Sequence, residues 1–499
     1  MAKTRSGCLP VIIGVGEYID QPVSPESSLE PRDMMAKALK QANKDCGGGA
    51  LVSIDSIDVV MPMSWRYADL AGELCAALEI SPTRAELGPS GGQTPLKYIH
   101  EAAKRIAEGK SQVAAVIGGE AQHSLVSAQR AGKIPPWTPF STKGPNWADT
   151  PGAIHPLAMS LGLYLPINVY PLFEAATAAH WRQTPQEADA ETGQILSASS
   201  HVAAENNLSW GPTALSASAI LEATPRNRIV SWPYTKSMVA SMNVNQSAAV
   251  IITSLAKAQQ MGVAEDKCVF ITQGAGANEP RDFLARENYY ESPAQEAVLN
   301  ALKTEHSVHE AAELYSCFPV VPKMARRILG RSVESPSTVT GGMSFFGAPL
   351  NNYMTHAACA MIHKIRNGEP SGLLYGQGEF VTKHYGLRLS KTAQNSELLF
   401  AHENTQATAD AARGPVPELI ENADGPAVIE TFAVPSNRDG SPSYAVIIAR
   451  METGERTLAR IDSSETATLA KLMNKTRYPI GDRGRVLKAE KGPSKWQPA

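Results

Sequence analysis

The sequence predicts a layered α/β protein with a separate β-rich domain at its C-terminal end. Up to about residue 390, short apolar runs alternate with helical patterns, which predicts strands covered by helices on both faces. Within that region a helix–turn–strand pattern occurs twice, so residues 105–120 align with residues 364–379. After residue 390, strand-like runs are joined by turn sequences instead of helices.

The predicted strands of the first region are short and continuously apolar. In chain order they are Val11–Val15, Ser56–Met61, Val113–Gly118, Ala248–Thr253, Cys268–Gln273 and Gly372–Tyr375. Strands without polar alternation are buried on both sides, so we expect layers of helices on either side of each sheet.

The repeated pattern predicts an internal duplication. The first copy has a helix ending at Gly109, a strand and then Glu120, and the second has Gly368, a strand and Glu379. Each helix also carries a proline near its start. Four identities over sixteen aligned positions can also arise by chance, so duplication and coincidence both stay open on this evidence.

A long segment, Gln122–Pro233, separates the two copies. It is rich in Trp, Pro, Ser and Asn and contains two helical stretches, Pro171–Arg182 and Thr184–Asn206. Insertions of this length usually carry a binding function and are seldom simple spacers.

The C-terminal region predicts a small, mostly β domain. Its strands are expected at Ala427–Ala433, Ser443–Arg450 and Glu455–Arg460, with one helix at Ser463–Asn474. We interpret the basic stretch Arg483–Lys495 as a solvated end. A nucleic-acid-binding barrel is disfavoured because no aromatic residues cluster between basic ones.

Composition excludes several classes of protein. The chain has 499 residues, with 46 Lys and Arg against 49 Asp and Glu, so no strong positive field attracts nucleic acid. Its six cysteines form no C-x-x-C pair, which favours a reducing, cytoplasmic location, and no metal site is expected. No apolar run approaches the length of about 18 residues that a membrane span needs.

Three segments can carry chemistry. In Gly88–Pro95, glycines precede a helix with Thr94 as the expected N-cap, so exposed N–H groups can hold a thioester oxygen. Cys317 lies between an expected helix and Pro319, and His384 follows a glycine-rich strand end. Taken singly, each has a plainer explanation: a tight turn, a buried inert thiol and an ordinary histidine.

Taken together, the motifs resemble the thiolase superfamily, specifically the thiolase-like proteins related to the sterol-carrier-protein thiolases. The strongest stretches are Leu314–Pro319, Thr340–Leu350 and Gly376–His384, and the similarity spans about residues 8–390. The β-rich end resembles the additional C-terminal domain of the type 1 members of that group.

The resemblance implies a duplicated five-layered α-β-α-β-α fold plus a small OB-like β domain. The first half would comprise residues 1–121 and 234–260, and the second half residues 261–395. The coenzyme A (CoA)-binding loop domain would be residues 122–233, and the additional β domain residues 396–499.

The catalytic positions of the family are where the sequence departs from it. The nucleophilic cysteine of thiolases falls at Gly92, and the histidine of the glycine-histidine-proline motif falls at Ala348. In the histidine-aspartate-cysteine-phenylalanine motif, Tyr315 replaces the histidine but Cys317 is retained. The cysteine-x-glycine motif falls at Gly376–Gly378, without its cysteine. Covalent thiolysis is therefore not expected, although the family name would suggest an acetyl-CoA acetyltransferase of lipid metabolism.

The sequence leads to two functional hypotheses. One is carbon–carbon bond chemistry on a CoA thioester by an aldolase-like route, with Cys317, His384 and Tyr315 as catalytic residues. Its expected CoA contacts are Gly92, Gln93, Thr94, Tyr234, Lys236 and Gly378. The alternative is a non-catalytic acyl-CoA-binding or scaffold subunit. In either case the CoA thioester is a substrate or ligand, and no cofactor is covalently bound.

The resemblance also implies partners for the chain. We expect a homodimer or homotetramer that pairs through the strand edge around Leu87–Gly91. The C-terminal domain can offer a surface to a further protein partner.

Overall fold

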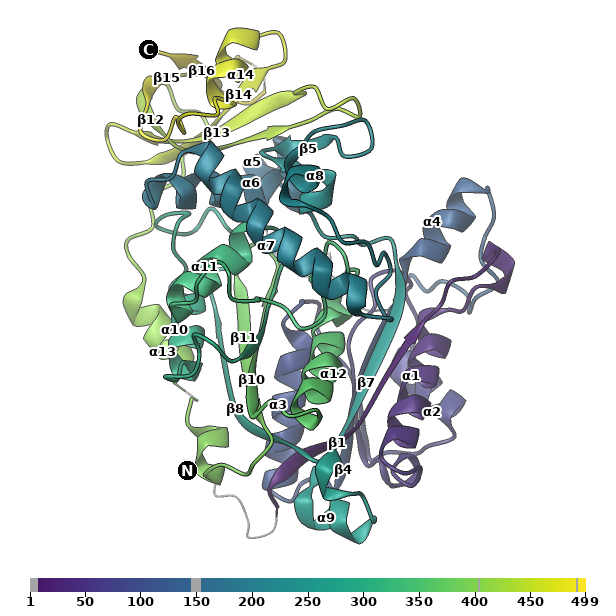
Figure 1. The fold of residues 1–499 in the computed structure, drawn as a ribbon. Coiled ribbons are helices and arrows are strands. Elements are labelled where there is room, and N and C mark those ends of the chain that lie inside the picture. The colour runs from purple at the N-terminus through teal and green to yellow at the C-terminus, as the bar shows by residue number, and fades with distance from the viewer. Residues whose placement is uncertain (1–7, 145–153, 403, 491) are drawn as a thin grey trace.

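The computed structural model describes residues 8–144, 154–402, 404–490 and 492–499, and within them one long, bent sheet forms the backbone of the molecule (Figure 1). Its strand order is β3-β2-β4-β7-β1-β8-β11-β10-β9. The strands are β1 (Pro10–Ile19), β2 (Ser56–Val59), β3 (Arg84–Leu87), β4 (Val113–Ala121), β7 (Asn245–Ser254), β8 (Val269–Asn278), β9 (Ala311–Leu314), β10 (Ser371–Gly378) and β11 (Lys383–Ser390).

The bend lies between β1 and β8. These two strands pair only at Val11 and Ile12 of β1, so beyond those residues they are free to diverge. The sheet therefore behaves as two sheets, with the buried helices α3 (Thr94–Ala107) and α12 (Tyr353–Arg366) packed between them and against each other. The outer helices are α1 (Pro31–Asp45) and α2 (Leu70–Leu78) on one side, and α10 (Pro293–Leu302) and α11 (Val320–Leu329) on the other. The short α9 (Leu255–Gln260) follows β7. The predicted layered α-β-α-β-α fold is confirmed.

All six predicted strands of this region are present, but β3, β9 and β11 were not predicted. β3 is an edge strand with no apolar run, and the later part of β11 alternates apolar and polar residues, as in Leu387, Arg388 and Leu389. Two local predictions are wrong. Cys317 follows strand β9 and not a helix, and Thr94 is the first residue of α3, whose N-cap is Gln93.

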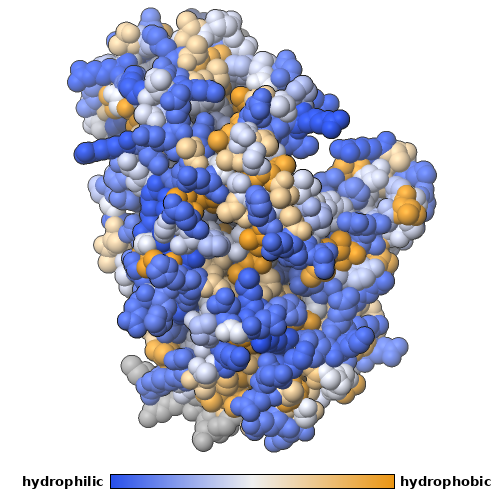
Figure 2. All heavy atoms as spheres, in the orientation of Figure 1, coloured by the Kyte–Doolittle hydropathy of each residue, from blue (hydrophilic) through white to orange (hydrophobic). Residues whose placement is uncertain are grey.

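The insertion between the halves is mainly helical. It contains α4 (Gln122–Arg130), α5 (Pro156–Ser160), α6 (Pro166–His180), α7 (Pro185–Glu205) and α8 (Ala217–Leu221). The expected threonine, Thr184, is the N-cap residue directly before α7, and Thr184 and Glu187 cap each other's backbone amides. α4 projects from the body, and a hollow separates it from the C-terminal domain (Figure 2).

The C-terminal domain packs on the insertion. Its strands β12 (Gly425–Pro435), β13 (Tyr444–Met451), β14 (Arg456–Asp462), β15 (Arg483–Leu487) and β16 (Lys495–Pro498) form a sheet that continues into β5 (Ile229–Trp232) and β6 (Tyr234–Thr235). The helix α14 (Thr466–Leu472) was predicted. The expected solvated end is wrong, because β15 and β16 belong to the sheet and bury Val486 and Trp496 in its core.

A strap connects the second half to this domain. It contains the 3-10 helix η7 (Ser396–Phe400) and α13 (Thr405–Ala412), which lie against β8 and α10. Within the described residues, no helix is both long and apolar enough to cross a bilayer.

Candidate functional site

The loop before α3 leaves no room for a nucleophile. A Cβ atom added to Gly92 would lie 2.2 Å from the hydroxyl oxygen of Tyr315 and 2.5 Å from the carbonyl oxygen of Gln377. Both distances are far below van der Waals contact. The tyrosine side chain therefore occupies the space into which a side chain at position 92 would extend.

Tyr315 is held by the second half of the fold. It follows β9, and its backbone amide donates to the carbonyl of Tyr375 on the neighbouring strand at 3.0 Å. Its ring packs edge-on against Tyr353 of α12. Among the described residues, its hydroxyl has no hydrogen-bond partner, although the side chain is nearly buried. Burial raises the pKa of the phenol well above its usual value, so the hydroxyl stays protonated and can donate.

Cys317 lies two residues further on, in a pocket of polar but uncharged groups. Its Sγ atom is 3.8 Å from the Oε1 atom of Gln377. The Gln377 amide in turn donates to the hydroxyl of Tyr170, on α6 of the insertion, at 3.0 Å. Tyr170 also stacks on Phe318, with ring centres 4.3 Å apart. Burial raises the pKa of the Cys317 thiol to about 12, so very little thiolate is present at neutral pH.

His384 is fully engaged elsewhere. Its Nδ1 atom lies 2.7 Å from the hydroxyl of Tyr375, and its Nε2 atom lies 3.2 Å from the hydroxyl of Ser292. The side chain is 1 % exposed, and burial lowers the pKa of the imidazole to about 4. Both ring nitrogens are occupied by these contacts, and among the described residues no hydrogen bond joins the imidazole to the Cys317 thiol.

The network behind His384 is anchored by a carboxylate. Glu279 accepts hydrogen bonds from the Ser292 hydroxyl and the Ala294 amide, both at 2.8 Å, and forms an ion pair with Arg413 at 3.0 Å. Burial opposes ionisation of Glu279, but the nearby Arg286 and these hydrogen bonds leave its pKa below the usual value. Because the carboxylate of Glu279 and both ring nitrogens of His384 have partners, this network supports the fold.

A residue that the sequence did not single out fixes the glycine loop. Asn351 follows the Gly347–Pro349 motif, and its Oδ1 atom accepts from the Gly91 amide at 3.0 Å, while its amide donates to Met61 at 2.9 Å. It thereby joins the two halves of the fold at the N-terminal end of α3. In the sequence, the signal that could have indicated Asn351 was its place as a polar residue directly after a family motif.

Left-handed backbone is concentrated around the same place. Leu350, Glu379 and Val381 have φ values of 44°, 55° and 56°, although none is glycine. Such conformations are costly for a β-branched residue like Val381 and persist only where packing imposes them. Both loops that carry these residues border the Gly92–Tyr315 region.

Three of the residues predicted to contact CoA, Gln93, Thr94 and Lys236, differ in burial and in hydrogen bonding. Gln93 is 8 % exposed and packs against Gly378, and its Oε1 atom is buried with no hydrogen-bond partner among the described residues. Thr94 is buried and donates to the carbonyl of Pro89 at 3.2 Å. Lys236 is exposed, so its predicted role on a CoA phosphate stays a prediction.

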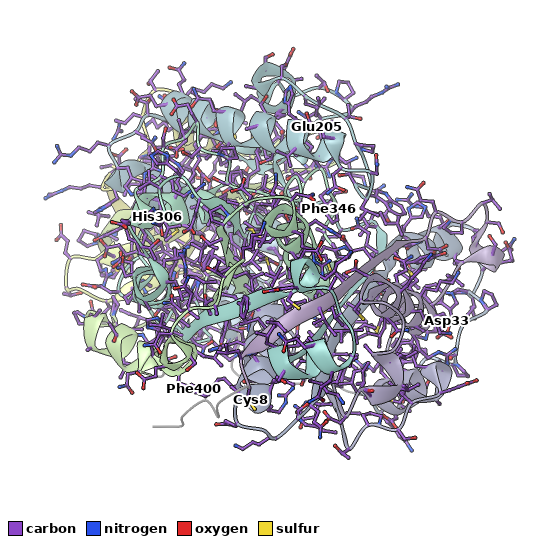
Figure 3. The ribbon with its side chains drawn as sticks, turned by 60° about the horizontal axis from the view of Figure 1, so that its bottom comes forward. Cys8, Asp33, Glu205, His306, Phe346 and Phe400 are labelled. Carbon is purple, nitrogen blue, oxygen red and sulfur yellow. The ribbon has the colours of Figure 1, made fainter. Side chains whose placement is uncertain are left out.

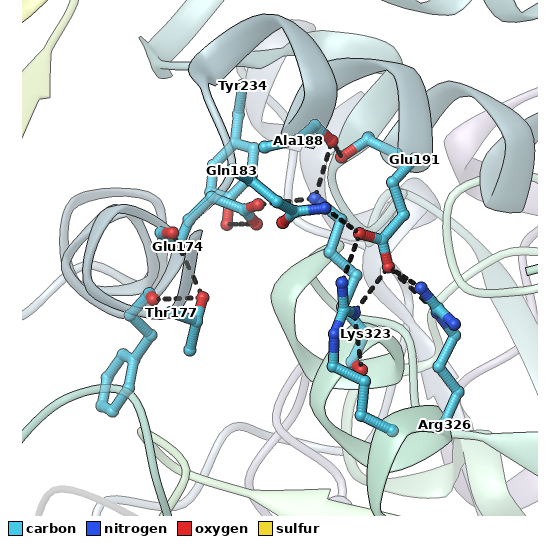
Figure 4. Close-up of polar contacts among 11 residues, drawn as sticks. Glu174, Thr177, Gln183, Ala188, Glu191, Tyr234, Lys323 and Arg326 are labelled. Atoms are coloured by element: carbon cyan, nitrogen blue, oxygen red, sulfur yellow. Dashed lines mark hydrogen bonds and ion pairs between the residues drawn. The ribbon is translucent and has the colours of Figure 1, made fainter. Parts of the chain in front are cut away.

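Tyr234 is buried and belongs to an ion-pair network between the insertion and α11 (Figure 4). Its hydroxyl donates to Glu174 at 2.8 Å, and Lys323 donates to the same carboxylate at 2.6 Å. Close by, Glu191 pairs with Arg326 and Arg327. The Tyr234 side chain therefore faces the interior, and the expected direct contact with CoA is not supported by its position.

Comparison with known proteins agrees with this architecture. Residues 407–491 match the model of the thiolase-like protein type 1 additional C-terminal domain. A search of curated proteins finds no match.

Solved structures extend the comparison to the whole chain. A monomeric SCP2-thiolase-like protein type 1 from Mycobacterium smegmatis has a TM-score of 0.80 and 27% identity, covering 99% of each chain. The Ltp2-ChsH2(DUF35) aldolase has a TM-score of 0.58 and 15% identity, over 77% of this chain and 98% of that one.

The human mitochondrial 3-ketoacyl-CoA thiolase in complex with CoA has a TM-score of 0.55 and 14% identity, over 78% and 99% of the two chains. These last two likenesses concern the fold alone. The domain match at the C-terminal end and the full-length likeness to the mycobacterial structure together support a thiolase-like protein with the additional C-terminal domain.

Proposed function

We propose that the protein binds a CoA thioester at the end of α3 and acts on it without a covalent intermediate. The observation that carries this proposal is the Tyr315 hydroxyl, which occupies the space of a nucleophile side chain at Gly92 and has no partner of its own among the described residues. A protonated donor at that place can bind the thioester carbonyl oxygen, together with the positive N-terminal end of α3.

The chemistry that these groups offer is aldolase-like. In a retro-aldol step, the β-hydroxyl passes its proton to a water molecule and the bond between the α- and β-carbons breaks, which releases an aldehyde or ketone. The electron pair of that bond becomes the enolate of the thioester, which then takes a proton back from water. Tyr315 would stabilise the enolate oxygen by donating a hydrogen bond, and Cys317 would supply a second neutral donor. One such donor typically contributes about 10²–10³-fold to the rate.

The second candidate is a non-catalytic acyl-CoA-binding subunit. It is favoured by the protonation states, because the pKa of Tyr315 and that of Cys317 are both raised and the pKa of His384 is lowered. Neither Tyr315 nor Cys317 is ionised at neutral pH, so neither serves as a base there, and His384 is held elsewhere. This candidate needs the same ligand but no proton acceptor.

Titration calorimetry with acetyl-CoA and longer acyl-CoAs tests the shared part of the proposal. We expect saturable binding that weakens in Tyr315→Phe. Intact-mass measurement after incubation should show no acyl adduct. Absence of binding at millimolar CoA thioester would overturn the proposal, and a Cys317 adduct that free CoA discharges would show a true acyltransferase instead. Release of an aldehyde or ketone from β-hydroxyacyl-CoA then separates the enzyme from the binding subunit.

Two further roles stay predictions. Lys236→Ala should weaken CoA binding. If Lys236 contacts a phosphate, the substitution should weaken the binding of free CoA but not that of pantetheine, which lacks the phosphates.

The oligomeric state is the second of these predictions. β3 is the sheet edge that we expect to pair, but its Arg84 and Glu86 are charged, as in edges that resist pairing. The mycobacterial structure is described as monomeric. Light scattering that gives the mass of one chain would overturn the predicted dimer.

A further inference from the structure

The C-terminal domain covers one end of the molecule, whereas the Tyr315–Cys317 centre lies in its interior (Figure 1). Phe346 marks this interior, because its ring contacts Tyr353, which in turn packs against Tyr315. Figure 3 shows Phe346 among packed side chains, while the exposed His306 lies toward the edge. Any influence of the domain on the centre is therefore expected to pass through the groups between them.

Arg456, the first residue of β14, ties the C-terminal domain to the loop of residues 279–292 between β8 and α10. Its side chain is fully buried. Its Nη1 atom donates to the carbonyls of Leu284 and Arg286, both at 2.6 Å, and its Nη2 atom donates to that of Glu287 at 2.9 Å. Its Nε atom donates to Glu430 of β12 at 2.9 Å, which supplies the opposite charge. One buried guanidinium thus fixes the backbone of this loop at three consecutive points.

Arg286 carries the connection from that loop to the turn of residues 379–382, which joins β10 to β11. Its Nη2 atom donates to the carbonyl of Val381 at 3.0 Å, and its guanidinium lies 4.9 Å from the ring centre of Phe173 on α6. The turn is strained, since Glu379 and Val381 have φ values of 55° and 56°. Such a conformation persists only where its surroundings impose it, and the bond from Arg286 is one of the contacts that do so.

The same turn orients the polar groups around Cys317. The carbonyl of Glu379 accepts from the Tyr170 hydroxyl at 2.7 Å and from the Gln377 amide at 3.0 Å. The Oε1 atom of Gln377 is the group that lies 3.8 Å from the Cys317 thiol. A change in the backbone at Glu379 would therefore move both hydrogen-bonding partners of the centre.

A second contact of the domain reaches the same place from the other side. Thr431 of β12 is buried and donates to the carbonyl of Leu172 in α6 at 2.5 Å. Leu172 lies two residues after Tyr170 on that helix. The domain thus holds both the helix that carries Tyr170 and, through Arg286, the turn to which Tyr170 bonds.

We propose that the C-terminal domain positions the Tyr170–Gln377 pair beside Cys317, with Arg456 and Arg286 as positioning residues. Loss of Arg456 would release three carbonyls of the loop, Arg286 would lose its fixed place, and the strained turn would relax. The consequence for a CoA thioester rests on the proposed function, but the effect on the turn does not.

Hydrogen–deuterium exchange of the full chain, read by mass spectrometry, tests the effect on the turn. It compares wild type with Arg456→Met and Arg286→Met in peptides that cover residues 376–383. A further reporter is the Glu279 amide, which donates to the carbonyl of Thr382 at 2.7 Å.

Arg366→Met is the matched control for the loss of a buried guanidinium. Arg366 is the last residue of α12, about 20 Å along the helix from the end that lies beside the centre. Like Arg456, it bonds to one carboxylate, Asp45 at 2.7 Å, and to backbone carbonyls, those of Lys267 and Ile13, both at 3.0 Å. We expect the two variants to lower the melting temperature alike, so that exchange in the turn separates them.

Calorimetry with acetyl-CoA and with free CoA gives the functional readout. Free CoA lacks the thioester carbonyl that the centre would bind, so a displaced centre should lower the affinity for acetyl-CoA relative to free CoA. A general loss of folded protein would lower the binding of both ligands alike, as we expect for Arg366→Met.

We expect exchange in the turn to be about tenfold faster in Arg456→Met and in Arg286→Met, and unchanged in Arg366→Met. The inference is overturned if the turn exchanges at the wild-type rate in Arg456→Met, or equally fast in Arg366→Met. If wild type binds no acetyl-CoA, the proposed function fails, and the exchange rates still decide the role of the domain. If Arg456→Met does not fold, Arg456→Lys against Arg366→Lys gives the same comparison, because lysine keeps the charge but lacks the planar fork.

Discussion

The Tyr315–Cys317 centre and the His384 network both come from family-like motifs of the sequence, but they differ in how completely their polar groups are hydrogen-bonded. Tyr315 presents beside Gly92 a hydroxyl that has no hydrogen-bond partner among the described residues, and the Cys317 thiol has only long contacts, such as the one of 3.8 Å to Gln377. His384, in contrast, is bonded at both ring nitrogens and is backed by Ser292 and Glu279. Polar groups that are fully paired stabilise a fold, whereas an unpaired donor near a helix end is available to a ligand. Hydrogen-bond saturation, more than residue type, distinguishes the two regions.

The Tyr315–Cys317 centre depends on the insertion through Tyr170 of α6, and the largest expected effect tests how α6 is held. Lys323→Met leaves Glu174 of α6 buried without its cation, since the pair is 2.6 Å apart and almost fully buried. We expect a loss of about 3–5 kcal/mol in the free energy of unfolding, measured by chemical denaturation. The double variant Glu174→Met with Lys323→Met should recover most of it. A single variant as stable as wild type would show that α6 is held by other contacts.

The next effect concerns pH and belongs to the His384 network alone. Burial lowers the pKa of His384 from 6.5 to about 4, so between these values only the unfolded chain binds the proton. Stability contributed by neutral His384 is therefore complete above pH 6.5 and falls by up to about 3 kcal/mol as the pH drops to 4. The advantage of wild type over His384→Gln should shrink by that amount across this window. A constant difference would mean that His384 is charged or exposed.

A smaller effect tests the packing of the centre. Gly92→Ala places a methyl group against the Tyr315 hydroxyl and the Gln377 carbonyl, at the distances given above. We expect a cost of about 1–3 kcal/mol in unfolding free energy, as for other overpacked sites. Adding Tyr315→Ala should recover part of this cost, because the carbonyl remains. If Gly92→Ala is neutral on its own, the loop can move and a nucleophile can be accommodated.

The last prediction compares the two regions directly, because the same hydroxyl oxygen is removed from a tyrosine in each. The smallest effect is expected for Tyr315→Phe. Tyr375→Phe deprives His384 of a buried partner and should cost about 1–3 kcal/mol. Tyr315→Phe removes a hydroxyl that no described residue pairs with, so it should change stability by less than about 0.5 kcal/mol, while acyl-CoA binding weakens. Equal costs in denaturation would show that the two regions do not differ in saturation.

The sequence by itself determined the architecture. Continuous apolar runs such as Val113–Gly118 bury both faces whatever surrounds them, so six strands and the layered fold were predicted from local pattern. The glycine at position 92 and the thiol at position 317 were likewise located through motifs that survive in the chain. The strands β3 and β11 were missed because their residues are largely polar or alternate, and β9 because it is only four residues long and contains Glu313. Pairing with neighbouring strands imposes the conformation of all three.

What only the tertiary structure decided is which polar groups meet. Tyr170 and Gln377 are far apart in sequence, as are Gly91 and Asn351, and no local pattern encodes those bonds. The same origin holds for the pairing of His384 with Ser292, for the burial of Tyr234, and for the Tyr315 hydroxyl that finds no partner in the described part of the chain. Hydrogen bonds act over about 3 Å between groups that folding brings together, so their partners follow from the packed layers and not from sequence spacing.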